Sequence, residues 1–252
     1  MVYDKDYAKY YDLFYKGKDY SEEVDFLKKI LDRFGRKPVK ILNLGCGTGA
    51  HDKDLVNEGY RITGMDLSEE MIAIAKNKVP DAKFVVGDIA NFELNEKFDV
   101  IICMFSVLGY LNENKQIKGF FDSCKRHLSD GGLLILDVWN GLGVMRELPT
   151  SREKSVEIGE LRIVRKSYPD LDPTNHLNKI RFNVKVFDNG ELIKDYDEDH
   201  KVRFFFPLEI RKYMEDVGFE VKHLCPSFEI DKKLGFEWNM VVVGELKSNS
   251  LE

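Results

Sequence analysis

The sequence predicts an α/β protein with a doubly wound, mostly parallel seven-stranded sheet and an antiparallel β insertion. Two observations support this fold class. Between residues 38 and 140, short apolar strands alternate with amphipathic helices, the pattern of parallel βαβ units with helices on both faces of the sheet. After Asn140 the pattern changes to strand-like segments separated by turns, which indicates antiparallel hairpins.

The N-terminal 37 residues contain one clear amphipathic helix, predicted at 21–34. Ser21 suits its N-cap, and apolar residues from Val24 to Phe34 recur on one face. We therefore expect residues 1–37 to form a helical segment that precedes the core.

Strands and helices then alternate through residues 38–140. Ligands of such sheets bind at the carboxyl ends of the strands, so the functional site is expected there. The predicted elements are strands at 39–44, 61–66, 84–86, 100–104 and 133–138, and helices at 50–59, 68–78 and 115–127.

Residues 141–206 are predicted to be an antiparallel insertion, with strands at 156–168, 178–188 and 191–206. The run Asp188-Asn-Gly190 is a hairpin turn signal. Residues 207–248 complete the main sheet: Pro207 opens a helix to about residue 217, and strands follow at 219–225 and 237–245. We expect the last strand to be antiparallel.

Composition narrows the function. The chain has 252 residues and a formal net charge of −6, so no basic face for nucleic acid is indicated. Its four cysteines form no CxxC pair, the N-terminus lacks the pattern of a signal peptide, and no apolar run reaches the length of a membrane span. These features predict a cytoplasmic protein that binds neither nucleic acid nor membrane.

A glycine loop lies between the first core strand and the first core helix. Gly45, Gly47 and Gly49 allow a tight turn and a close approach of the backbone to a ligand, and the helix N-terminus offers free N–H groups. With Ala50 the same residues match GxGxxA, a variant of the dinucleotide fingerprint. The loop alone therefore does not distinguish a nicotinamide dinucleotide from another adenosine cofactor.

Two acidic residues follow the next two strands. Asp66 ends the second strand, where a carboxylate can accept both hydroxyls of a ribose. Asp88 ends the third strand and can accept the exocyclic amine of an adenine, with Ile89 packed against the ring. Either residue could instead serve a turn or a helix cap; the succession of all three features favours a cofactor site.

With these features the sequence resembles the class I S-adenosylmethionine-dependent methyltransferases over residues 38–140. Phe98-Asp-Val-Ile-Ile-Cys-Met-Phe-Ser106 is similar to the fourth strand of that family, and His127-Leu-Ser-Asp-Gly-Gly-Leu-Leu-Ile-Leu136 to its turn into the fifth. Asn43 stands where the family has an acidic residue near the methionine amine. The resemblance implies that S-adenosylmethionine binds to Asn43, Gly45, Cys46, Gly47, Asp66, Leu67, Met71, Asp88, Ile89 and Met104.

A closer resemblance is to the small-molecule N-methyltransferases that dimethylate nucleotide-linked amino sugars. It covers the tyrosine-rich segment 7–20 and the run Phe98–Leu111. It implies that residues 1–37 form a lid over the methionine end of the cofactor, with Tyr15, Lys18 and Tyr20 as the matching residues. The expected acceptor is a small molecule methylated at an amine by in-line displacement.

Further site residues follow from position alone. A protonated amine must lose a proton before attack, and Tyr110, His127 and Asp137 are candidates to take part. Trp139 could form a wall of the acceptor site, although core packing is commoner for such a residue. No histidines pair at metal-ligand spacing, so no metal is expected.

Several alternatives stay open at this point. The GxGxxA match allows a nicotinamide-dependent dehydrogenase, and Asn43 allows a non-catalytic S-adenosylmethionine-binding regulator. The insertion could cover the acceptor site or form a dimer contact. A monomer and a homodimer are both compatible with the sequence.

Overall fold

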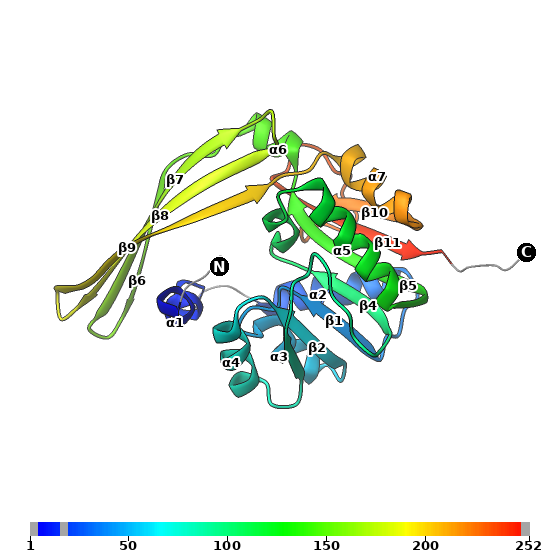
Figure 1. Cartoon of the computed structure of the whole chain (residues 1–252), viewed down its shortest axis with the longest axis horizontal. Coiled ribbons are helices and arrows are strands. Elements are labelled where there is room, and N and C mark those ends of the chain that lie inside the picture. Colours follow the sequence, from blue (N-terminus) through cyan, green and yellow to red (C-terminus); the bar gives the residue numbers. More distant parts are fainter. Residues whose placement is uncertain (1–4, 16–19, 248–252) are drawn as a thin grey trace, which may run out of the picture.

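A computed structural model of the chain describes residues 5–15 and 20–247, and its core is one mixed sheet of seven strands (Figure 1). The strands lie in the order β10-β11-β5-β4-β1-β2-β3, and only β11 runs antiparallel to its neighbours. The predicted fold class is therefore confirmed, including the antiparallel last strand. The bounds are β1 Lys40–Leu44, β2 Arg61–Asp66, β3 Lys83–Val86, β4 Phe98–Cys103, β5 Leu128–Trp139, β10 Phe219–Pro226 and β11 Asn239–Leu246.

Strand β1 lies at the point where the strand order reverses. Asn43 of β1 is in register with Gly64 of β2 on one side and with Ile102 of β4 on the other. Connections from β1 run outward to β2 and β3, whereas the later strands lie beyond β4. Crevices form at such switch points, beyond the carboxyl ends of the strands, and this one contains the glycine loop.

Helices cover both faces of the sheet. On one face, α2 and α3 pack on apolar side chains such as Ile41 and Val100; on the other, α5 and α7 pack on a second set that includes Leu42 and Ile101. Successive strand residues therefore serve opposite cores, as expected for a doubly wound sheet. The bounds are α2 Tyr20–Arg33, α3 Ala50–Asn57, α4 Glu69–Lys78, α5 Asn114–His127 and α7 Pro207–Val217.

The insertion is a separate antiparallel sheet of four strands, not three. The strand predicted at 156–168 is wrong, because Gly159 adopts a left-handed φ of +60° and splits it into a hairpin. The predicted turn at Asn189-Gly190 is confirmed, and both residues have positive φ. The strands are β6 Arg152–Ile158, β7 Leu161–Asp172, β8 Leu177–Asp188 and β9 Glu191–Arg203, and the unpredicted helix α6 Gly141–Arg146 precedes them.

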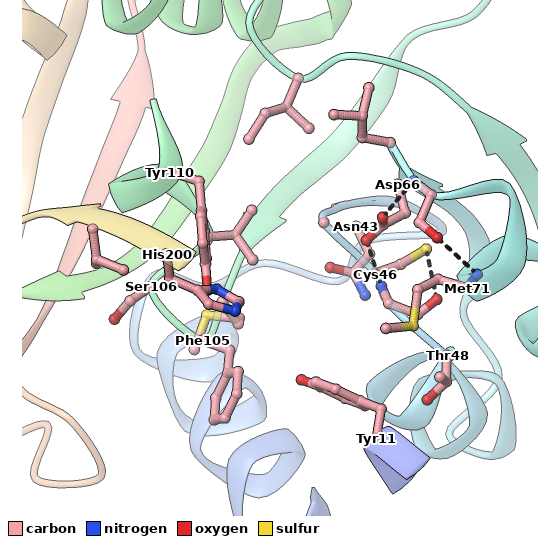
Figure 2. Close-up of a pocket in the computed structure, with 18 of the residues that line it drawn as sticks. Tyr11, Asn43, Cys46, Thr48, Asp66, Met71, Phe105, Ser106, Tyr110 and His200 are labelled. Carbon is pink, nitrogen blue, oxygen red and sulfur yellow. Dashed lines mark hydrogen bonds between the residues drawn. The ribbon is translucent and has the colours of Figure 1, made fainter. Parts of the chain in front are cut away.

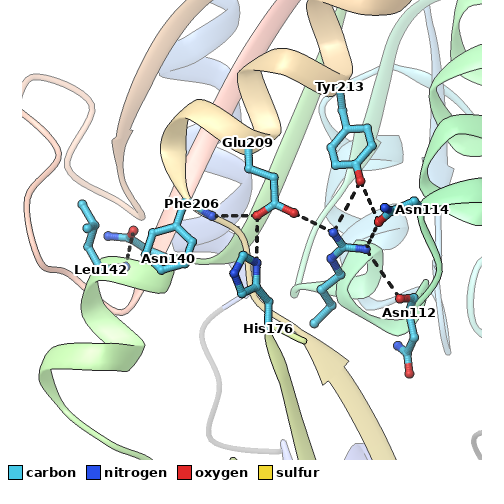
Figure 3. Close-up of polar contacts among 9 residues, drawn as sticks. Asn112, Asn114, Asn140, Leu142, His176, Phe206, Glu209 and Tyr213 are labelled. Atoms are coloured by element: carbon cyan, nitrogen blue, oxygen red, sulfur yellow. Dashed lines mark hydrogen bonds and ion pairs between the residues drawn. The ribbon is translucent and has the colours of Figure 1, made fainter. Parts of the chain in front are cut away.

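A polar network centred on the buried side chain of Arg203 joins the base of the insertion to the core (Figure 3). Arg203, at the end of β9, donates to Glu209 Oε1 of α7 at 2.6 Å and to Asn114 Oδ1 of α5 at 2.7 Å. Glu209 also pairs with His176 in the turn between β7 and β8. Because Arg203 is only 7% exposed, these charge-assisted contacts fix where the insertion leaves the core.

Helix α1 (Lys5–Phe14) lies between the insertion and the core (Figure 1). Tyr10 and Phe14 pack on apolar residues of β7 and β8, while Asp12 faces the glycine loop and α4. The predicted N-terminal segment thus divides in two: α2 belongs to the core, and only α1 joins the insertion. Among the described residues, no helix is long and apolar enough to cross a membrane.

Candidate active site

A pocket of about 500 Å³ opens at the carboxyl ends of β1, β2 and β4 and continues under the insertion (Figure 2). One part is lined by the glycine loop and the residues that follow β2 and β3. The other part is lined by the segment after β4, by Trp139, and by side chains of β7, β8 and β9. We call these two parts of the one pocket the loop chamber and the insertion chamber.

The glycine loop forms one wall of the loop chamber, as its sequence predicts. Gly45 has φ +73°, and an added Cβ would lie 2.3 Å from Val107 Cγ1. Gly47 has φ +55° and lines the pocket, and an added Cβ would meet no protein atom within 4 Å. No side chain therefore covers the backbone at Gly47, where a ligand would approach. The loop leads into the N-terminus of α3.

Asp66 lies at the end of β2 beside this loop. Its Oδ2 accepts the N–H of Gly47 and its Oδ1 the N–H of Ser68, both at 2.9 Å. Burial raises the pKa of Asp66, and these backbone donors oppose the rise. The hydrogen bonds fix the carboxylate at the pocket wall and leave further lone pairs for ligand hydroxyls.

Apolar side chains complete the loop chamber. Leu67 lines it although it is 54% exposed, whereas Met71, Ile89 and Met104 are buried in its wall. Asp88 stands at the rim, where its Oδ1 accepts the N–H of Ala90 in a short turn. A flat ring could lie between Leu67 and Ile89 with the Asp88 carboxylate at its edge.

Asn43 is buried behind the glycine loop, and the nitrogen of its side-chain amide is hydrogen-bonded to an acidic residue. Its Nδ2 donates to both carboxylate oxygens of Asp52, in the first turn of α3, at 3.1 Å each. Asp52 is fully buried, and burial raises its pKa to about 6 against the opposing effects of Asn43, His51 and Lys78. Sequence reasoning did not identify this carboxylate, because an acidic residue in a first helical turn ordinarily complements the helix dipole.

Tyrosines of the N-terminal helices close the pocket beside the loop. Tyr15 and Tyr20 both line it, as does Tyr11 of α1; Lys18 lies outside the described residues. Burial, and after it Asp12 and Glu23, raises the pKa of Tyr20, so its hydroxyl stays protonated. Near it, His51 contacts Glu23 of α2.

A polar cluster fastens α1 against the core. Asp12 accepts from Thr48 Oγ1 of the glycine loop and from Lys78 Nζ of α4, each at 2.6 Å. Lys78 Nζ also donates to Thr48 Oγ1 at 2.9 Å. One face of α1 is thus tied to the loop chamber while its apolar face packs on the insertion.

The segment after β4 lines the pocket and has a constrained backbone. Phe105 and Ser106 have φ values of +62° and +56°, unusual for residues with side chains. The Asp137 carboxylate accepts the N–H of Ser106 and so stabilises this turn. Phe105 in turn meets Tyr15 edge to face, with ring centroids 5.3 Å apart, across the pocket.

The structure brings some acid–base candidates to the pocket and not others. Tyr110 lines the insertion chamber (Figure 2). Asp137 is absent from the pocket wall and acts on the loop backbone instead. His127 is not in the pocket either: it is buried at the end of α5, where it bonds Ser123 and Leu94. Trp139 does line the pocket and packs edge to face on Trp238.

The insertion supplies pocket residues that sequence reasoning did not identify. Arg165 of β7, Phe182 of β8 and His200 of β9 all line the insertion chamber. In the sequence, only the alternation of residues along each strand points to them. This alternation predicts which side chains share a face of the sheet, but not which part of the protein that face covers. In the described part of the chain, no group of three or more potential metal ligands comes together.

These residues fit S-adenosylmethionine. The bare backbone at Gly47 and the fixed carboxylate of Asp66 suit a ribose, and the apolar pair with Asp88 suits an adenine. Asn43 and the tyrosines line the pocket beside the glycine loop, and they would suit a methionine chain. A dinucleotide fits less well, because β11 lies antiparallel between β5 and β10, whereas a second mononucleotide half needs parallel strands.

Comparisons with known proteins agree with this arrangement. The methyltransferase domain family matches residues 41–132. A dTDP-3-amino-3,4,6-trideoxy-alpha-D-glucopyranose N,N-dimethyltransferase of Streptomyces venezuelae is 27% identical over 225 residues, which cover 88% of this chain and 94% of that protein. A dTDP-3-amino-3,6-dideoxy-alpha-D-glucopyranose N,N-dimethyltransferase of Streptomyces fradiae is 26% identical over 88% of this chain and 87% of that protein.

The fold of a solved relative matches nearly the whole chain. The crystal structure of Streptomyces venezuelae DesVI superposes with a TM-score of 0.81 at 25% identity, and the match covers 98% of this chain and 100% of that one. Fold, cofactor site and relatives agree, and the cofactor is S-adenosylmethionine. The chain belongs to the class I S-adenosylmethionine-dependent methyltransferases.

Proposed function

We propose that the chain methylates the amine of a small molecule, and that this acceptor is a nucleotide-linked amino sugar. The observation that carries the proposal is the insertion chamber, which continues the cofactor pocket and is enclosed by α1, the segment after β4, and the insertion. Such a chamber suits a small acceptor. The named activities of the relatives from Streptomyces support the same acceptor class.

One pair of neighbouring cations in the insertion supports an anionic acceptor. Lys154 of β6 and Arg165 of β7 are directly paired in register, an arrangement of like charges that destabilises a sheet. Burial, and after it Arg165, lowers the pKa of Lys154. A diphosphate beside the two cations would relieve their repulsion. We infer from this, and from the pocket lining, that the insertion covers the acceptor and is not mainly a dimer contact.

The work assigned to the protein is alignment and exclusion of water. S-adenosylmethionine supplies an electrophilic methyl group on its sulfonium, and in-line displacement requires the acceptor nitrogen to lie opposite the sulfur. Asn43, Asp66 and the glycine loop would hold the cofactor's ends. The contact of Tyr15 with Phe105 would close the reacting volume from solvent.

The proposal is tested by incubating the protein with S-adenosylmethionine and dTDP-3-amino-3,4,6-trideoxy-alpha-D-glucopyranose, with products followed by mass spectrometry. The control acceptor is the same nucleotide sugar with a hydroxyl in place of the amine. We expect one and then two methyl groups on the amine and none on the control. Methylation of the hydroxyl control, or of neither compound across a panel of sugar nucleotide amines, would overturn the proposal.

A further inference from the structure

Three polar side chains that the cofactor does not need form a line that starts at the insertion chamber; Tyr110 and His200 line the chamber and Glu198 lies beyond His200. Tyr110 ends the short helix η1 (Val107–Tyr110), and its hydroxyl lies 3.2 Å from His200 Nδ1 of β9 (Figure 2). On the other side of the imidazole, Nε2 lies 3.4 Å from Glu198 Oε2. His200 and Glu198 are two residues apart on one strand, so they share the face that looks into the pocket.

This line is fixed by close packing. Helix η1 approaches β9 through Gly109, where an added Cβ would lie 2.8 Å from the carbonyl oxygen of Arg203. His200 is 2% exposed and Glu198 8%, and the Phe182 ring meets the imidazole edge to face. The spacing between core and insertion at this point therefore leaves the three groups little freedom.

The hydrogen-bond directions follow from the groups themselves. A carboxylate only accepts, so His200 must donate to Glu198 through Nε2–H. Its Nδ1 is then the acceptor, and the Tyr110 hydroxyl donates to it. The Tyr110 side chain also lines the chamber, where its oxygen can act as an acceptor toward a bound amine. The second oxygen of Glu198 is buried without a hydrogen-bond partner among the described residues, a cost that packing alone does not explain.

We propose that Tyr110, His200 and Glu198 form a proton relay that removes a proton from the acceptor amine, with His200 as the group that retains it. The inference rests on the proposed N-methyl transfer. An N–H bond of the ammonium breaks as its proton passes to the Tyr110 oxygen. The Tyr110 proton passes to His200 Nδ1, and the imidazolium is stabilised by Glu198. The freed lone pair can then attack the methyl group.

The relay gives the insertion a role in the chemistry as well as in the enclosure of the acceptor. An alkyl amine is mostly protonated near neutral pH, as the lysine reference pKa of about 10.4 shows. An ammonium has no lone pair for the methyl group and is repelled by a sulfonium.

The polar surroundings of the His200 imidazole come from the core and from the insertion. Among the described residues, Tyr110 and Glu198 lie next to the imidazole, and Arg165 and Tyr196 lie farther along the same face of the insertion.

The kinetic test compares His200→Gln, Glu198→Gln and Tyr110→Phe with wild type on the amino sugar nucleotide named above. The matched control is His223→Gln, whose histidine bonds the carbonyl of Ile230 outside the pocket. We expect kcat of His200→Gln to fall about 100-fold near neutral pH, with the acceptor KM and the Kd for S-adenosylhomocysteine changed less than about threefold. The loss should shrink as pH rises, because more amine arrives deprotonated.

A purely structural role predicts a different result, namely a raised KM or Kd and no recovery at high pH. Methylation of the amine by His200→Gln at the wild-type rate would overturn the relay and leave the proposed function intact. A second measurement needs no acceptor: nitrogen-15 correlation spectra of the histidine rings with S-adenosylhomocysteine bound. The Nε2–H tautomer of His200, altered in Glu198→Gln, is expected; an Nδ1–H tautomer would overturn the relay whatever the acceptor.

Discussion

For the buried pair of Asn43 and Asp52 we predict that one substitution raises the stability of the protein and lowers its affinity for the cofactor. In Asp52→Asn the carboxylate that accepts both hydrogen bonds from Asn43 becomes a neutral amide. Such an amide can donate to Asn43 Oδ1 and turn the Asn43 side chain around. Its N–H₂ group would then face the methionine amine of the cofactor, where an acceptor is needed. We therefore expect a more stable protein that binds its cofactor less well.

The stability change can be estimated from the pKa. The Asp52 pKa of about 6 exceeds the unfolded value of 3.8 by about two units, equivalent to about 3 kcal/mol. A raised acid pKa means that the folded state loses stability as pH rises from about 4 to about 6, and the loss is complete above that range. Above that range, Asp52→Asn should stabilise the free protein by up to about 3 kcal/mol, which raises Tm by about 6–12 °C for a chain of this size. Near pH 5 about half of the difference should remain, and near pH 4 most of it should vanish.

Cofactor binding should change in the opposite direction. Loss of the oriented acceptor for an ammonium costs about 1.5–3 kcal/mol, or about 10- to 100-fold in Kd for S-adenosylhomocysteine. The control ligand is 5′-methylthioadenosine, which lacks the amino-acid portion and should bind both proteins alike. In wild type, the affinity for S-adenosylhomocysteine should fall as pH drops below about 6, while that for the control ligand should not.

Calorimetric titration and thermal unfolding check these expectations together. Equal losses for both ligands would show a general distortion of the pocket and refute the reasoning. A lower Tm at neutral pH would refute the assignment of Asp52 as a buried, costly charge.

Three further predictions concern the frame of the site. Gly45→Ala adds a Cβ 2.3 Å from a valine side chain, at a residue with positive φ. We expect Tm to fall and calorimetry to detect no binding of S-adenosylhomocysteine. Unchanged binding would show that the cofactor does not approach the backbone closely at this glycine. Asp12→Asn removes the ion pair with Lys78. Because both side chains are partly exposed, the dissociation rate of the cofactor should rise only about two- to fivefold in stopped-flow measurements. A rise that does not depend on salt would show that the ion pair is not its cause. Arg203→Met removes a buried cation whose partners Glu209 and Asn114 are half-buried and exposed, respectively, so it should cost about 1–3 kcal/mol in urea unfolding; a loss below about 0.5 kcal/mol would show that the network does not anchor the insertion.

Much of the core could be predicted because its signals are local. The strand at Arg61–Asp66 was placed with its observed bounds, since an apolar run between a helix-ending glycine and a capping serine admits few alternatives. The hairpin at Asn189-Gly190 was equally clear, because few residues adopt positive φ there. The break at Gly159 was missed because the residues on both sides of it continue a strand pattern.

The acceptor side of the site could not be predicted in the same way. His200 meets Tyr110 across 90 residues of sequence, and their contact depends on how the insertion folds back over the core. Asp52 was overlooked because burial, which no pattern in a helix of eight residues reveals, turns it from a surface acid into a partner of Asn43. Long-range packing determines the contacts of both His200 and Asp52, whereas the positions of the glycine loop and Asp66 can be predicted from short motifs.

The central claim is that one pocket holds the cofactor at the glycine loop and an amine acceptor under the insertion. A crystal structure with S-adenosylhomocysteine and an amino sugar nucleotide bound tests it most directly. We predict the adenosine between Asp66 and Asp88, and the acceptor nitrogen opposite the sulfur and within hydrogen-bond distance of the Tyr110 hydroxyl. An acceptor bound outside the insertion chamber, or an amine directed away from the sulfur, would contradict the account.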